Sequence, residues 1–124
     1  MKLALFSDIH SNLQALQACM AHAQAQGATQ LAFLGDMVGY GGEPTAVLDT
    51  IMLAVQAGAW AVRGNHDDLA LLPPSQIQHV GEQGALWTHA QLSPAHKDFL
   101  AQLPLLSQHE HLLLVHASAH HPER

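Results

Sequence analysis

The chain has 124 residues, of which 48% are hydrophobic and 11% are charged, so we expect one domain folded around a packed core. Its formal net charge is −6 and it has only four Lys and Arg residues, which argues against duplex nucleic-acid binding through the phosphates. No segment has the length of a membrane span, and the sequence opens on a strand pattern rather than a secretion signal, so we expect a cytoplasmic protein without membrane contact.

The first half of the chain alternates strand and helix patterns. Three short apolar segments are typical of buried strands: KLALFS at 2–7, QLAFL at 30–34 and AWAV at 59–62. Helical patterns lie between them, from the candidate N-caps Ser11 and Asn12 to Gly27, and from Pro44 to Gly58. Units of this length predict an α/β fold with a mainly parallel sheet, right-handed crossovers and flanking helices.

The second half begins with a break at Pro73 and Pro74. A helical pattern follows at 82–92, and Ser93 with Pro94 opens a further helix that stops at Pro104. HLLLVH at 111–116 then predicts a fourth apolar strand.

Polar residues follow each predicted strand. Asp8 comes after the first, Asp36 after the second and Asn65 after the third, while His116 closes the fourth. Because open α/β sheets bind ligands at the carboxyl ends of their strands, we expect these four side chains to converge. His10 lies two residues beyond Asp8, and an extended backbone would point both side chains the same way.

Two carboxylates, two imidazoles and one amide, without a thiolate, favour Mn, Fe or Zn ions. Asp36 would bridge an ion held by Asp8 and His10 to a second ion held by Asn65 and His116. Such a pair stabilises the attacking and leaving oxygens of phosphoester hydrolysis. Each residue alone also has an ordinary alternative, since an Asp after a strand is commonly a helix cap or turn residue.

Four ordered segments carry a family resemblance. LFSDIHSN at 5–12, LGDMVGYGG at 34–42, VRGNHDD at 62–68 and LLLVHASA at 112–119 resemble the signature blocks of the calcineurin-like metallophosphoesterases, and more closely their small bacterial phosphodiesterase-type members. The resemblance extends from Lys2 to about Ser118. It implies that residues 1–124 form a single, incomplete metallophosphoesterase domain, the N-terminal portion of a four-layer sandwich.

The resemblance also implies roles for the site residues. The first of two divalent ions would be held by Asp8, His10 and Asp36, and the second by Asp36, Asn65 and His116. His66 would be the catalytic residue that faces the substrate, beside Asn65, and would donate a proton to the leaving group or stabilise the transition-state charge. Asp67 would support the loop. Arg63 stays open between a phosphate contact and a structural ion pair.

Two departures from the family pattern change the expected function. Gly39 and Tyr40 stand where phosphoprotein phosphatases carry an Asp-Arg pair, which favours a diester or a small phosphate ester as substrate and leaves the orientation of His66 unexplained. The family's later Gly-His-x-His block is missing, and His120 and His121 are expected to form a disordered tail rather than to replace it. An uncovered sheet face would then favour homo-oligomers.

Three hypotheses therefore stand. The leading one is a metal-dependent phosphoesterase in which water activated by two metal ions hydrolyses phosphodiesters or small phosphate esters. The alternatives are a non-catalytic metal- or phosphate-binding module and an inactive, truncated fragment of such an enzyme. Two kinds of residue are expected outside the site: Cys19 as a buried structural thiol, and surface imidazoles at His22, His79, His89, His96, His109 and His111.

Overall fold

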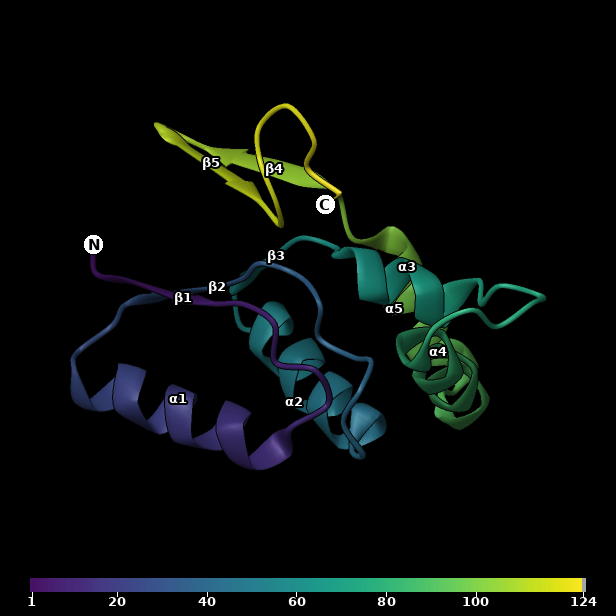
Figure 1. Cartoon of the computed structure of the whole chain (residues 1–124). Coiled ribbons are helices and arrows are strands. Elements are labelled where there is room, and N and C mark those ends of the chain that lie inside the picture. Colours follow the sequence, from purple (N-terminus) through teal and green to yellow (C-terminus); the bar gives the residue numbers. More distant parts are fainter. Residues whose placement is uncertain (124) are drawn as a thin grey trace.

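The computed structural model describes residues 1–123, and its centre is a three-stranded parallel sheet (Figure 1). The strands are β1 (Leu3–Phe6), β2 (Gln30–Phe33) and β3 (Trp60–Ala61), in the order β1-β2-β3. Phe6 is paired with Phe33, and Phe33 with Ala61. The crossovers are α1 (Leu13–Ala25) and α2 (Pro44–Gln56). The predicted α/β class is therefore confirmed.

The two faces of this sheet have different covers. Helices α1 and α2 lie on one face, and a hairpin of β4 (Leu106–His109) and β5 (Leu112–Val115) lies over the other (Figure 1). The expectation that the fourth apolar strand joins the parallel sheet is wrong, because β5 pairs antiparallel with β4. Glu110, with φ of 54°, makes the tight turn between them. Leu114 of β5 packs on Ala32 and Val62 of the central sheet region.

Three further helices, α3 (Asn65–Leu71), α4 (Val80–Gln91) and α5 (Pro94–Gln102), pack together beside α2 (Figure 1). The segment at 65–71 was expected to be a loop. It is helical because the carboxylate of Asp67 accepts the N–H of the N-cap residue Gly64 at 2.9 Å, which satisfies a donor at the helix start.

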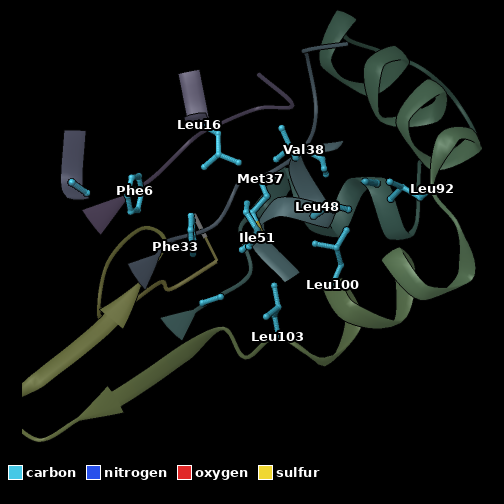
Figure 2. Packing of buried hydrophobic residues seen from close by; sticks show 14 residues of the cluster. Phe6, Leu16, Phe33, Met37, Val38, Leu48, Ile51, Leu92, Leu100 and Leu103 are labelled. Carbon is cyan, nitrogen blue, oxygen red and sulfur yellow. The ribbon is translucent and has the colours of Figure 1, made fainter. Parts of the chain in front are cut away.

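The main core lies between the sheet and its helices (Figure 2). The rings of Phe6 and Phe33 stack with centroids 5.0 Å apart, and Leu16, Leu48 and Ile51 are fully buried beneath them. Burial of each such side chain stabilises the fold by about 1.5–3 kcal/mol. The core therefore holds fixed the strand ends from which the site loops depart.

Local signals set most helix boundaries. The side chain of Asn12 accepts the N–H of Ala15 at 3.0 Å and caps α1, and Ser93 caps α5 in the same way through His96. The expectation for Cys19 is wrong, because this thiol lies off the α1 stripe that faces the core and is exposed.

His96 is also not a surface residue: it is buried, and its Nε2 lies 2.7 Å from the carboxylate of Asp49 on α2. None of the helices described at 1–123 is both long and apolar enough to cross a bilayer.

Candidate metal centre

The loops that follow β1 and β2 are joined by backbone hydrogen bonds. The N–H of Asp8 donates to the carbonyl of Gly35 at 3.1 Å, and the N–H of His10 donates to that of Asp36 at 3.0 Å. The N–H of Ser11 likewise donates to the carbonyl of the residue after Asp36. Two loops that are 28 residues apart in sequence are thereby aligned side by side, with their polar side chains at the carboxyl edge of the sheet.

The backbone in these loops is left-handed rather than extended. Asp8, His10 and Asp36 have φ values of 58°, 48° and 52°. The expectation that an extended backbone aims Asp8 and His10 in one direction is therefore wrong in its geometry, although the two side chains do meet. Left-handed non-glycine residues cost about 1–2 kcal/mol each, and such strain clusters at functional sites.

Asp36 occupies the middle of the cluster. Its Oδ2 lies 3.6 Å from Nε2 of His10 and 3.4 Å from Nε2 of His116, while its Oδ1 accepts the backbone N–H of His66 at 2.9 Å. Asp8 approaches the other side of His10, with its Oδ1 3.5 Å from Nε2. The side chain of Asp36 is 4% exposed and that of Asp8 is 53% exposed, so the cluster has a buried end and an open end.

The two imidazoles are held in the same way. Nδ1 of His10 donates to the carbonyl of Val38 at 3.0 Å, and Nδ1 of His116 donates to the carbonyl of Leu34 at 2.8 Å. A carbonyl oxygen only accepts, so in each neutral ring the proton is on Nδ1 and Nε2 carries a lone pair. Protein imidazoles that bind metals are oriented by this kind of outer hydrogen bond.

The lone pairs of the cluster converge without a donor between them. Nε2 of His116 lies 3.0 Å from Oδ1 of Asn65, which is also an acceptor, and 3.4 Å from the Asp36 carboxylate. One ligand atom each from Asp8, Asp36 and His116 lie within 4.8 Å of one another. Acceptor atoms that face one another in a partly buried site are satisfied by a cation. The carboxylate, imidazole and amide atoms of these residues therefore suit divalent metal ions.

The structure thus brings together the five predicted metal ligands, and it separates Arg63 from them. The guanidinium of Arg63 forms an ion pair with Asp68 and donates to the carbonyl of Leu103 at 2.7 Å. Of the two roles left open for this residue, the structural ion pair is the one that describes its contacts here. His121 is exposed and lies 4.0 Å from the carboxylate of Glu123, outside the cluster.

His66 lies at the start of α3 beside the cluster. Its ring centroid is 5.2 Å from that of His10 and 4.6 Å from that of Tyr40. Burial lowers the pKa of His66 below its ordinary value of 6.5; the charges of neighbouring imidazoles add to this effect, and the carboxylate of Asp36 opposes it. The metal-free protein therefore keeps this imidazole neutral at pH 7.

Asp67 supports the site from beneath. It is fully buried; its Oδ1 accepts the N–H groups of Met37 and Val38 at 2.9 and 3.2 Å, and its Oδ2 accepts that of Gly64. Burial raises the pKa of Asp67 to about 7, although these backbone donors act in the opposite direction. The expected supporting role matches these contacts, and Asp67 is not a surface residue.

Sequence reasoning missed Tyr40 as a neighbour of the site. A cavity of about 550 Å³ opens beside Asp8 and His10 and is lined also by Tyr40 and Glu43. The carbonyls of Leu34 and Val38 were missed as well, because backbone groups leave no sequence signal. For Tyr40, the signal was a large aromatic residue within a Gly-rich loop.

Comparisons with known proteins point to one family. The sequence profile of the calcineurin-like phosphoesterases matches residues 1–122. A metallophosphoesterase structure from Sphaerobacter thermophilus is 31% identical and superposes with a TM-score of 0.84 over 100% of this chain and 49% of its own. The uncharacterized protein MJ0912 of Methanocaldococcus jannaschii is 33% identical over 98% of this chain and 51% of its own length.

A more distant structure, the hypothetical protein PH1004 from Pyrococcus horikoshii, shares the fold at 19% identity, with a TM-score of 0.71 over 85% of this chain and 48% of its own. The chain thus spans about half the length of the relatives it matches, and its fold corresponds to the N-terminal part of metallophosphoesterase folds. The profile match and the sequence identity place this chain in the calcineurin-like phosphoesterase family.

Proposed function

We propose that the chain is a metal-dependent hydrolase of phosphodiesters or small phosphate esters that uses two divalent ions, with Mn, Fe and Zn as the best candidates. One observation carries this proposal. The carboxylate of Asp36 lies between two imidazoles whose Nδ1 protons are bound to backbone carbonyls, so that both Nε2 lone pairs point to the same carboxylate oxygen.

Five residues would hold the ions in two overlapping sets. Asp8, His10 and Asp36 form one set, and Asp36, Asn65 and His116 form the other. Bound divalent ions supply positive charge for the phosphoryl oxygens and activate water as the nucleophile. The chain itself has only four Lys and Arg residues, so this charge is what would hold a phosphate at an acidic site.

His66 is proposed to act on the substrate rather than on the ions. The backbone N–H of His66 donates to Oδ1 of Asp36 at 2.9 Å, and this hydrogen bond holds the start of α3 beside the proposed ligands. The imidazole beside the cluster would then donate a proton to the leaving-group oxygen or stabilise charge that develops there. Asn65, which precedes it, would also contact the phosphate.

The proposal is tested by metal content and turnover measured on the same samples. Untagged protein is analysed by plasma mass spectrometry and assayed with Mn and a chromogenic diester or monoester. We expect about two metal equivalents and diester hydrolysis. Asp36→Asn should lose both, because it removes the shared charge without changing the shape. Asp98→Asn, an exposed carboxylate on α5, is the matched control and should lose neither.

A second candidate is a metal- or phosphate-binding module without turnover. The observation that favours it is length, since the chain spans about half of the matched relatives. Bound metal that is lost in Asp36→Asn, with no hydrolysis of either ester by the wild type, would select this alternative. Absence of both metal and turnover after addition of Mn would reject both proposals.

A further inference from the structure

Tyr40 has an unusual environment for an aromatic residue. It lies in the loop after β2 with a left-handed backbone, φ being 60°, and it is 61% exposed. Its ring nevertheless contacts two site imidazoles: the centroid distances are 4.6 Å to His66 and 4.9 Å to His10. A left-handed backbone at a non-glycine residue costs free energy, and such residues cluster at functional sites.

Among residues 1–123, no hydrogen bond fixes the rotation of the His66 imidazole. Its Nδ1 is buried and has no partner within the described part of the chain. Its backbone N–H is bound to Asp36, but that contact does not orient the ring. The ring is held by packing alone: His10 lies edge-on at 90°, and a Cβ added to Gly39 would be 3.2 Å from Nδ1.

We infer that Tyr40 is the positioning residue for His66, and that its ring, tilted by 45° against the imidazole, fixes the imidazole by packing against it. This inference rests on the proposed function, because it assigns the orientation of the imidazole that would act on the leaving group. It also accounts for the departure from the family pattern at residues 39 and 40. Aromatic rings at these distances attract one another beyond the area that they bury, which favours one ring orientation over others.

Helix α4 also packs against Tyr40. A Cβ added to Gly81 would lie 3.1 Å from the hydroxyl of Tyr40 and 3.5 Å from Cε1 of His66. Gly84, one turn later, lies close to the backbone of Tyr40. Glycine within a helix is less favourable than alanine, so Gly81 indicates that close approach to Tyr40 is what it provides, whereas a Cβ at Gly84 would make only an ordinary contact.

The first test compares Tyr40→Phe with Tyr40→Leu in the full chain. Tyr40→Leu keeps an apolar side chain but removes the ring. We expect unchanged metal content, a kcat lower by about 10- to 100-fold with little change in KM, and weakened NOEs between the ring protons of His66 and His10, because a misplaced catalytic group loses rate and its ring leaves this contact. Tyr40→Phe keeps the ring and should behave as the wild type in all three measurements.

The NMR comparison separates this inference from the proposed function. If the wild type binds metal without turnover, the hydrolase proposal fails, while weakened NOEs between the His66 and His10 rings in Tyr40→Leu but not in Tyr40→Phe still support positioning. Unchanged NOEs between these two rings in folded Tyr40→Leu would overturn the inference. Equal loss of kcat in Tyr40→Phe and Tyr40→Leu would also overturn the inference, because the rate would then depend on the hydroxyl of Tyr40 and not on the contact between the rings.

A second variant covers the case in which Tyr40→Leu fails to fold. Gly81→Ala favours the helix but presses on the Tyr40 hydroxyl, so it should move the His66 signals and lower kcat without loss of stability. The double variant Gly81→Ala/Tyr40→Phe removes the closest contact and should restore much of the kcat and of the wild-type His66 signals. Gly81→Ala with His66 signals identical to those of the wild type would contradict the proposed positioning of His66 by Tyr40.

Discussion

Asp67 and Asp68 are sequence neighbours with opposite environments. Asp67 is fully buried and accepts three backbone N–H groups, whereas the side chain of Asp68 is 42% exposed and pairs with Arg63. Acidic residues are seldom buried without partners, and here the partners are the backbone donors of the β2 loop and of the α3 start. Asp67 therefore ties the two segments that carry Asp36 and Asn65.

We expect Asp67→Ala to lower the free energy of unfolding by at least about 2 kcal/mol, because it leaves three buried donors unpaired. Asp68→Ala is the matched control and should change it by less than about 1 kcal/mol, since exposed ion pairs contribute little. Urea unfolding of the metal-free proteins, followed by circular dichroism, measures both. Equal midpoints for the two variants would contradict the supporting role of Asp67.

His66 gives a prediction with a definite sign. Burial lowers its pKa in the folded protein, so below pH 6.5 the unfolded chain binds the proton more readily than the folded chain does. This group therefore lowers the free energy of unfolding as the pH falls below 6.5. An NMR titration of the metal-free protein should show a midpoint below 6.5 for the signal that disappears in His66→Asn. A midpoint at or above 6.5 would refute this assignment.

At the scale of elements, the site depends on the close approach of two loops. A Cβ added to Gly35 would lie 2.6 Å from the backbone nitrogen of Gly64, and one added to Gly64 would overlap the Asp36 carboxylate. The absence of these Cβ atoms lets the end of β2 and the start of α3 touch. The proposed metal ligands Asp36 and Asn65 are neighbours for this reason.

Gly64→Ala should therefore separate the loops, weaken metal binding and destabilise the protein by about 1–3 kcal/mol through overpacking. The φ of Gly64, −99°, suits alanine, so the effect is steric. Gly42→Ala has open space around its Cβ and serves as control. Metal affinity measured by competition with a chromogenic chelator should fall only for Gly64→Ala, and equal affinities for both variants would count against this view.

For the whole molecule, the exposed apolar surface around the sheets is the main feature. Leu5 on β1 is 57% exposed, and Leu106 and Leu113 on the hairpin are 49% and 47% exposed. Within the described chain, β1 pairs only with β2 and its other edge is open. Open strand edges beside apolar side chains favour association.

We therefore expect this chain to self-associate through these strands. Size-exclusion chromatography with light scattering should show a mass above 13.3 kDa that rises with concentration. Leu5→Lys should shift the protein toward monomer, whereas Leu53→Lys, at an exposed position on α2, should not. A monomer at high concentration in the wild type would count heavily against this expectation.

Strand and helix positions near the N-terminus were predictable because their signals are local. Buried parallel strands appear as continuous apolar runs, and Asn12, Pro44 and Ser93 mark helix starts through their own side chains. By contrast, the sequence of α3 has no helical period. Its start is stabilised instead by the hydrogen bond from the N–H of Gly64 to the carboxylate of Asp67. β4 is a polar segment that becomes a strand only by pairing with β5.

The sequence by itself determined the fold class and the family and named the candidate metal ligands, because apolar runs, caps and ordered motifs are properties of short segments. Only the tertiary structure decided the role of each side chain. Left-handed turns aim Asp8 and His10, backbone carbonyls orient both imidazoles, and Arg63 turns to Asp68. The contacts of the two imidazoles with backbone carbonyls join residues 28 and 82 positions apart, and they form only when packing brings the loops together.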